Sequence, residues 1–197
     1  LPPRPLPSGS YVRARRQGLC SWTLREFNRL EGEFARRKHG GFVRECHGDL
    51  HLGNVALLAG EPVPFDAIEF NEAFRWVDVM NEVAFPVMDL VHHGLDALAH
   101  RFLDAYLDAT GDYAGLRTLR FYLTYRAMVR AKVSCIRAHQ GGISEADRER
   151  SANACRGHLE LAQRLARRPP GVLVAMHGVS GSGKTTISGH LVEALGA

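Results

Sequence analysis

The stretch from Gly178 to Thr185 constrains the fold most, because it matches the pattern G-x-x-x-x-G-K-[ST]. In such a pattern the glycines let successive backbone N–H groups turn toward an anion, and a helix begins close to the lysine. The apolar run 172–176 before it predicts a short buried strand, and residues 187–195 after it predict a helix. We therefore expect a strand, a phosphate-cradling loop and a helix, in that order. The alternative is a Gly- and Ser-rich surface turn.

This pattern gives each residue a task in binding ATP. The loop N–H groups would contact the phosphates, Lys184 would reach the β- and γ-phosphates, and the Thr185 hydroxyl would bind Mg²⁺. The predicted nucleotide-binding residues are Gly178, Val179, Ser180, Gly181, Ser182, Gly183, Lys184, Thr185 and Thr186. Turnover would also need a Walker-B aspartate on a second strand, and only thirteen residues follow Lys184. We expect the opening of a nucleotide-binding domain, cut off after its first helix.

A second pattern, HGDLHLGN, occupies residues 47–54. Four residues separate Asp49 from Asn54, the same gap as between the catalytic-loop Asp and Asn of protein kinases. The Asp49 carboxylate could accept or orient the proton of an acceptor hydroxyl, and the Asn54 amide oxygen could bind Mg²⁺. Residues 55–65 predict a hairpin that would deliver Asp66 as a second metal ligand. His47 would brace the loop by hydrogen bonding.

A zinc site is the alternative for this second pattern. His47 and His51 lie four residues apart, as two zinc ligands on a helix do. Gly48 and Gly53 favour a loop instead, and no glutamate stands between the two histidines. The interpretation as a catalytic loop also accounts for the hairpin and for Asp66, which the zinc interpretation leaves unexplained.

The remaining chain predicts a mostly helical protein. Residues 1–21 begin with a proline-rich segment and are expected to be extended or disordered. Apolar periodicity predicts helices over 22–37, 77–92, 95–109, 115–138 and 144–168. Gly40-Gly41 ends the first of them, and Ser144 to Asp147 is typical of a capped helix start. Pro169-Pro170 marks a domain boundary.

Composition excludes several classes of protein. The net charge is +4, and the positive charge is spread along the chain, so we expect no nucleic acid partner. Four cysteines stand at wide spacings without a CxxC pair, which favours reduced thiols and a cytoplasmic location. No apolar run approaches the ~20 residues that a membrane-spanning helix needs, and we expect no membrane partner.

Several segments together resemble the aminoglycoside-phosphotransferase-like family of bacterial proteins. They are ECHGDLHLGN, FDAIEFNEAFRWVDVMNEVAF, MDL, GDY and YRAMVRAKV. The resemblance is to the two-part kind, in which a C-terminal P-loop kinase-like domain follows. It implies an α/β fold, mostly α, with a protein-kinase-like C-lobe over 22–168 and the first strand–P-loop–helix unit of a P-loop NTPase domain over 171–197. It also implies an ATP-dependent phosphotransferase that acts on a small-molecule hydroxyl.

The resemblance assigns roles to individual residues. Asp49 would be the catalytic base, with His47 beside it in the catalytic loop, and Asn54 and Asp66 would bind Mg²⁺. Asp78 would brace the loop, and its alternative role is that of an ordinary acid at a helix N-terminus. A kinase-like enzyme also needs a preceding lobe with a lysine on a strand. Since only Lys38, on a predicted helix, precedes His47, we expect a fragment that is truncated at both ends and inactive alone.

Two other functions stay open. In one, the P-loop module is the active enzyme and the kinase-like part only binds a ligand or regulates. In the other, the protein is a nucleic-acid-associated ATPase that uses its basic helices. Arg126, Arg130 and Lys132 could form an anion-binding patch near the acceptor, which would not suit a polycationic aminoglycoside. The alternative is that they pair with acids such as Glu69, Glu72 or Asp78.

Overall fold

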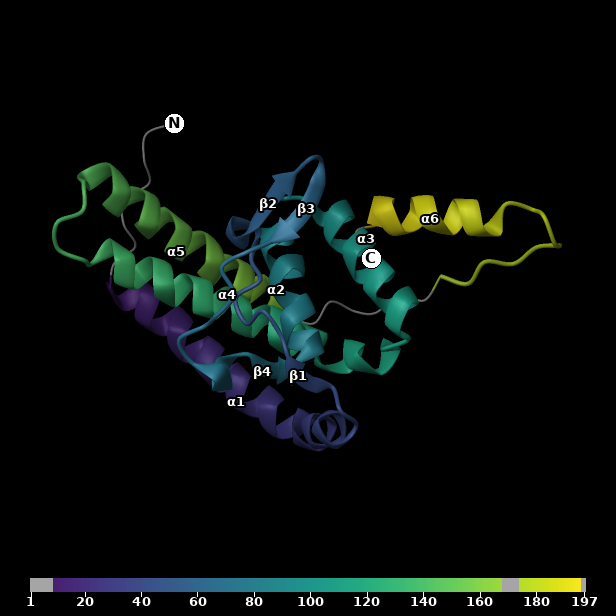
Figure 1. Cartoon of the computed structure of the whole chain (residues 1–197), viewed down its shortest axis with the longest axis horizontal. Helices are drawn as coiled ribbons and strands as arrows, with labels where there is room; N and C mark the ends of the chain where they lie inside the picture. Colours follow the sequence, from purple (N-terminus) through teal and green to yellow (C-terminus); the bar gives the residue numbers. More distant parts are fainter. Residues whose placement is uncertain (1–8, 168–173, 196–197) are drawn as a thin grey trace.

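The structure is a computed structural model that describes residues 9–167 and 174–195, and most of these residues are helical. The helices are α1 (Gly9–His39), α2 (Val79–His92), α3 (Asp96–Thr110), α4 (Leu116–Ala138), α5 (Glu145–Ala166) and α6 (Lys184–Leu195) (Figure 1). The strands β1 (Val43–Glu45), β2 (Val55–Leu58), β3 (Glu61–Pro64) and β4 (Trp76–Asp78) form two antiparallel pairs. The expectation of a mostly α protein with a small hairpin is confirmed.

Helix α2 lies at the centre of the packing. Met80, Asn81 and every residue from Val83 to Leu90 are buried, including Pro86, through which the helix continues. One side of α2 packs with α3 and α4 through Met80, Val87 and Leu107. Another side packs with α1, α4 and α5 through Phe85 and Met88. Because α2 is covered on several sides, its sequence is nearly continuously apolar.

Helix α1 corrects the expectation for the N-terminal segment. Residues 1–21 are predicted to be extended or disordered, but α1 begins at Gly9, so the prediction is wrong from there onward. The helix is stabilised by tertiary packing, because Leu19 is buried against Phe85 and Met88. The local sequence alone does not predict it. Residues 1–8 lie outside the described part of the chain. The helix ends as expected before Gly40-Gly41.

The two strand pairs flank the loop of residues 47–54. Strands β2 and β3 form the predicted hairpin, with Val55 opposite Pro64 and Leu58 opposite Glu61. Ala59 and Gly60 make its turn, both at positive φ (53° and 88°), as a tight two-residue hairpin requires. Strand β1 precedes the loop and pairs with β4, which leads directly into α2. The loop is thereby anchored in β1 at one end and in β2 at the other.

The C-terminal part differs from its prediction. Residues 174–176, expected to end a buried strand, form no strand, and Val174 and Met176 are exposed. A strand needs a neighbour for its backbone hydrogen bonds, and none of the described strands lies beside this segment. Residues 172–173 and Pro169-Pro170 lie outside the described ranges. The predicted helix is present as α6, beside α3 (Figure 1).

The other predicted helices are present, with shifted ends. Ser144 caps α5, since its side-chain oxygen accepts a hydrogen bond from the N–H of Asp147, as the sequence predicts. Residues 77 and 78 belong to β4 instead of the following helix. Among the described helices, none combines the length and apolar character needed to cross a membrane.

Candidate functional site

The loop of residues 47–54 has a backbone shape that requires glycine at its second position. Gly48 has a φ of 85°, and a Cβ atom there would lie 2.9 Å from the carbonyl oxygen of Phe74. His47 ties the loop to the chain after the hairpin: its Nε2 lies 2.8 Å from the carbonyl oxygen of Phe65, and its own carbonyl accepts from the N–H of Ile68. This is the bracing contact expected of His47.

Asp49 and Asn54 meet inside the loop. The Asn54 amide nitrogen donates to the backbone oxygen of Asp49 at 3.0 Å and lies 3.4 Å from its Oδ2. Asn54 is buried, while the Asp49 side chain stays 43% exposed. Since the nitrogen faces Asp49, the Asn54 oxygen is left to face a different partner. The Asp49 carboxylate is therefore accessible to solvent and lies beside the Asn54 amide, whose orientation is fixed.

His51 controls the charge of Asp49. Its Nδ1 accepts a hydrogen bond from the N–H of Gly53, so in the neutral ring the proton is on Nε2. That Nε2 lies 3.6 Å from the Oδ2 of Asp49. The pKa of Asp49 is lowered, first by this contact with His51, against the effect of burial, and then by the charges of His51, Arg130 and Arg126. Asp49 is therefore ionised at neutral pH.

Asp66 follows the hairpin in a strained conformation. The N–H of Phe65 donates to the carbonyl of Asn54, which holds Asp66 next to the end of the loop. Asp66 has a φ of 61°, which costs a non-glycine residue free energy and often marks a functional position. Among the described residues its carboxylate has no hydrogen-bond or ion-pair partner. Oxygen donors from Asp66 and Asn54 are the kind that Mg²⁺ prefers, so these residues fit that ion.

Helix α2 supplies two acids that hold the loop, the half-buried Glu82 and the buried Asp89, and sequence reasoning missed both. Glu82 accepts from the N–H of Gly48 through both carboxylate oxygens, at 3.1 and 3.2 Å. Asp89 accepts from the N–H of Leu52 at 2.9 Å. Burial raises the pKa of Glu82, while Arg126 opposes that shift. The sequence does contain a signal for these two residues, because two acids seven positions apart lie on one face of an otherwise apolar helix.

Arg126 completes the support from α4. Its guanidinium donates to the carbonyl of Gly48 at 3.1 Å and to the side-chain oxygen of Asn81 at 2.9 Å, and it lies 3.8 Å from Glu82. It also stacks over the ring of Phe85. Arg126 therefore pairs with an acid, as the alternative to an anion-binding patch expects, but the acid is none of the three named, Glu69, Glu72 and Asp78. It binds the loop and Glu82 instead.

Arg130 and Lys132 have different surroundings from Arg126. Arg130, one turn further along α4, has a buried Nε without a hydrogen-bond partner, and its charge acts on Asp49. Lys132 is exposed and lines a separate pocket between helices. The three basic residues therefore do not form one patch.

Asp78 has a structural role away from the loop. It caps α2 by accepting from the N–H of Met80, and it pairs with the buried Arg37 at 2.7 Å. Arg37 also pairs with Asp112 at 2.8 Å, which joins α1 to the start of α4. The described contacts of Asp78 include none to residues 47–54. The alternative role, an acid at a helix N-terminus, is the one that the structure shows.

The structure does not support the alternative in which His47 and His51 are two ligands of a zinc ion. His47 and His51 serve different partners, a backbone carbonyl and the Asp49 carboxylate. Within the described ranges, no three His, Cys, Asp or Glu side chains are grouped in a way that could hold a metal ion.

The second glycine loop is closed by its own lysine. Lys184, the first residue of α6, directs its Nζ to the carbonyl oxygens of Gly178 at 2.7 Å and Val179 at 2.6 Å. Gly181 and Gly183 have positive φ values of 75° and 76°, as a tight loop needs. Thr185 and Thr186 begin α6 and line a pocket against α3. The glycines thus form a tight turn before α6, and none of the described strands lies beside it.

Comparison with known proteins gives relatives without an assigned function. The chain is 36% identical over 164 residues to proteins of Mycobacterium tuberculosis and Mycobacterium bovis whose names describe them as uncharacterized. The match covers 83% of this chain but 32% of each relative, so the chain spans about a third of their length. No protein-family model matches the chain. No solved structure matches it significantly.

Proposed function

We propose that this chain carries the catalytic loop of an ATP-dependent phosphotransferase that acts on a small-molecule hydroxyl. In this proposal residues 22–168 are the C-lobe of an aminoglycoside-phosphotransferase-like, kinase-related domain. Residues 171–197 open a P-loop domain that follows it. The observation that carries the proposal is the grouping of Asp49, Asn54 and Asp66 around one braced loop.

The chemistry follows from the state of Asp49. An ionised carboxylate can accept the proton of an acceptor hydroxyl while the hydroxyl oxygen bonds to the γ-phosphorus of ATP and the bond to ADP breaks. Asn54 and Asp66 would hold Mg²⁺, which neutralises charge on the phosphates when bound. His47, Glu82 and Arg126 keep the loop in place, so that catalysis is mainly positioning.

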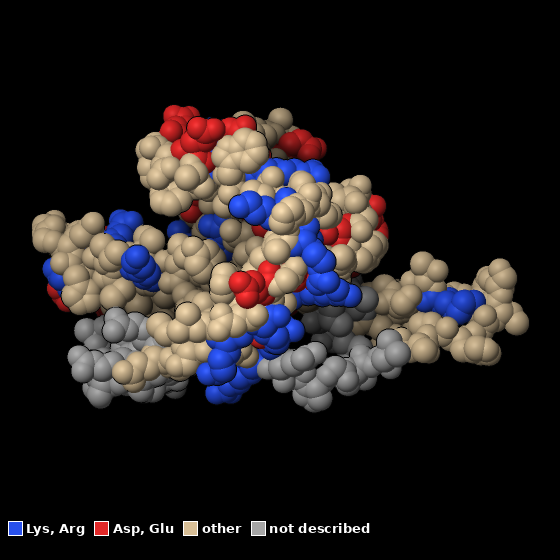
Figure 2. All heavy atoms as spheres, turned by 90° about the horizontal axis from the view of Figure 1, so that it is seen from below, with Lys and Arg blue, Asp and Glu red and all other residues tan. Residues whose placement is uncertain are grey.

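The surroundings of Asp49 also bear on the acceptor. Arg126 and Arg130 both act on its carboxylate with positive charge, and the Nε2 of His51 lies 3.6 Å from it. A polycationic acceptor would be repelled there, so we propose a neutral or anionic hydroxyl compound. We leave nucleic acid out of the proposal, because acidic side chains lie among the Lys and Arg side chains on the face that Figure 2 shows.

The test is phosphoryl transfer by the protein as its gene encodes it. Transfer from ATP would be measured by ³¹P NMR across neutral, anionic and polycationic hydroxyl compounds. Asp49→Asn should reduce transfer at least about a hundredfold, the usual effect of losing a positioned acid or base. Asp108→Asn, which changes an acid on α3 outside the loop, is the matched control and should leave transfer unchanged. Equal turnover in the two variants would refute the proposal.

A further inference from the structure

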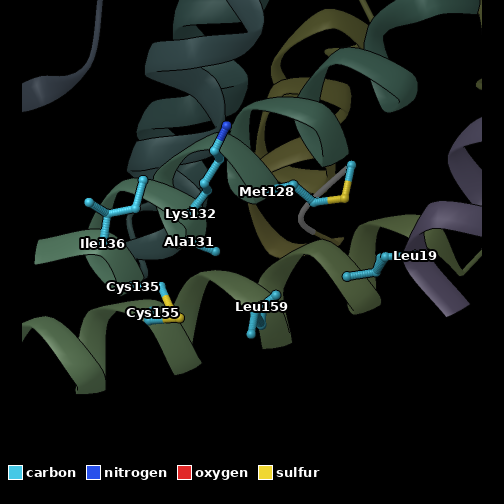
Figure 3. A pocket seen from close by; sticks show the side chains of 8 residues that line it. All are labelled: Leu19, Met128, Ala131, Lys132, Cys135, Ile136, Cys155 and Leu159. Atoms are coloured by element: carbon cyan, nitrogen blue, oxygen red, sulfur yellow. The ribbon is translucent and has the colours of Figure 1, made fainter. Parts of the chain in front are cut away.

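A pocket unconnected with the glycine loops lies between α1, α4 and α5. Its volume is about 270 Å³, and its lining is almost entirely apolar. The lining residues are Leu19, Met128, Ala131, Lys132, Cys135, Ile136, Cys155 and Leu159. Figure 3 shows these side chains, with Cys135 on α4 and Cys155 on α5 at one end.

The two cysteines face each other across the helix pair. Their sulfur ends point toward one another in Figure 3, and both side chains line the same pocket. Both are free thiols and both are half-buried, so a small reagent can reach them from the pocket. Helices α4 and α5 are packed along their length, which holds this arrangement in place. Two thiols in contact on separate helices meet the first geometric requirement for a bridge.

We propose that Cys135 and Cys155 form a thiol-modification site that takes low-molecular-weight disulfides and closes into an internal disulfide between α4 and α5. The site is independent of the proposed phosphotransferase activity, because neither cysteine belongs to the loop of residues 47–54. It modifies the expectation from cysteine spacing, which favours four unconnected reduced thiols.

The order of the two chemical steps follows from the surroundings of the thiols. Burial, and then the neighbouring Cys135, raise the pKa of Cys155 to about 11, so Cys155 is a poor first nucleophile. The Cys135 thiolate would therefore attack first.

The balanced reaction has two exchanges. Cys135 attacks one sulfur of the small disulfide, whose S–S bond breaks, and one small thiol leaves. The Cys155 thiol then gives up its proton and attacks Cys135 sulfur in the mixed disulfide, and the second small thiol leaves. The protein loses two hydrogens and two electrons overall, and the small disulfide is reduced to two thiols.

The test is oxidation of the folded chain with glutathione disulfide, followed by mass spectrometry. We expect a digest to contain the peptide of Cys135 joined to that of Cys155. In a variant with both Cys20→Ser and Cys46→Ser, which removes the exposed Cys20 thiol, the intact mass should fall by two hydrogens. The same treatment in guanidinium, where the fold is lost, should give mixed pairings among all four cysteines. The bridged protein should also melt roughly 5 °C higher, since it closes a loop of moderate length.

Variants separate this outcome from general thiol reactivity. Cys155→Ser should stop at a glutathione adduct on Cys135, and in Cys135→Ser the remaining Cys155 should react slowly or not at all. A variant with both Cys20→Ser and Cys46→Ser is the matched control and should form the bridge as before. The proposal is overturned if the folded wild type keeps a glutathione adduct without a bridge, or if its links involve Cys20 or Cys46.

Discussion

Two loops in this chain carry phosphate-handling patterns, and they differ in what holds them. The loop of residues 47–54 is bound by Glu82, Asp89 and Arg126, which come from two helices far along the sequence. The loop of residues 178–183 is closed by Lys184, which bonds carbonyls of the same loop. A pattern of glycines can therefore set a local shape, while a rigid site needs buried polar partners from elsewhere in the fold.

The largest expected effect of this difference is on stability. Arg126→Met should lower the free energy of unfolding by about 3–5 kcal/mol, because it leaves Glu82 buried without its cation and the Gly48 carbonyl without a donor. Lys184→Met is the matched change in the second loop and should stay within about 0.5 kcal/mol, because that lysine is half-exposed and its hydrogen bonds are open to solvent. Denaturant unfolding measures both. Equal effects would remove the distinction between the loops.

A second comparison uses glycines with similar backbone angles. Gly48→Ala should cost about 2–3 kcal/mol, because strain at positive φ adds to overlap with the Phe74 carbonyl. Gly183→Ala has a similar φ but open space around its Cβ, so it should cost about 1 kcal/mol. Unfolding curves of the two variants provide the measurement. A smaller loss for Gly48→Ala than for Gly183→Ala would contradict the described packing of the first loop.

The positive φ of Asp66 should lower the stability of the fold while placing its carboxylate for Mg²⁺ binding. Asp66→Gly should raise the free energy of unfolding by about 0.5–1 kcal/mol through relief of its positive φ, and it should weaken Mg²⁺ binding. Ala59→Gly, at the other non-glycine position with positive φ, is the control. It should give a similar gain in stability with unchanged Mg²⁺ affinity, as measured by titration calorimetry. Unchanged Mg²⁺ affinity in Asp66→Gly would remove Asp66 from the metal site.

The smallest predicted effect concerns the pKa of Asp49. His51→Phe keeps a ring against Phe85 but removes the donor, so the pKa of Asp49 should rise toward its ordinary value. In the wild type the folded pKa is lowered. Ionised Asp49 therefore adds stability above the unfolded value near ~3.9, and loses it as pH falls through the folded pKa. The variant should lose less stability on acidification over that range.

Carboxyl NMR titration below pH ~5 would follow this change directly. Asp147 is an internal reference, because Ser144 and then Arg150 lower its pKa far from His51. Its titration should be the same in wild type and variant. A shift of both residues would indicate a general change in the fold, and no shift of Asp49 would show that His51 does not set its charge.

Much of this fold was predictable because its signals are local. The hairpin follows from apolar runs around Ala59-Gly60, and α5 follows from the Ser144 cap. The loop of residues 47–54 was predictable as a candidate site from the spacing of Asp49 and Asn54 alone.

The rest depends on contacts between distant segments. Helix α1 begins at Gly9, and its residue Leu19 packs on α2. No local sequence pattern predicts this early start. Arg126 and Glu82 stand 44 positions apart, and their meeting requires α2 and α4 to pack. Residues 174–176 read as a strand, but a strand also needs a neighbour that local sequence does not provide.

The most direct test is to measure phosphoryl transfer and ATP binding in Asp49→Asn and Lys184→Met variants of the protein as its gene encodes it. We predict that Asp49→Asn abolishes transfer to the hydroxyl acceptor while ATP still binds, and that Lys184→Met retains this transfer. The opposite pattern, with transfer kept in Asp49→Asn and lost in Lys184→Met, would show that the P-loop module is the active enzyme and would contradict the account.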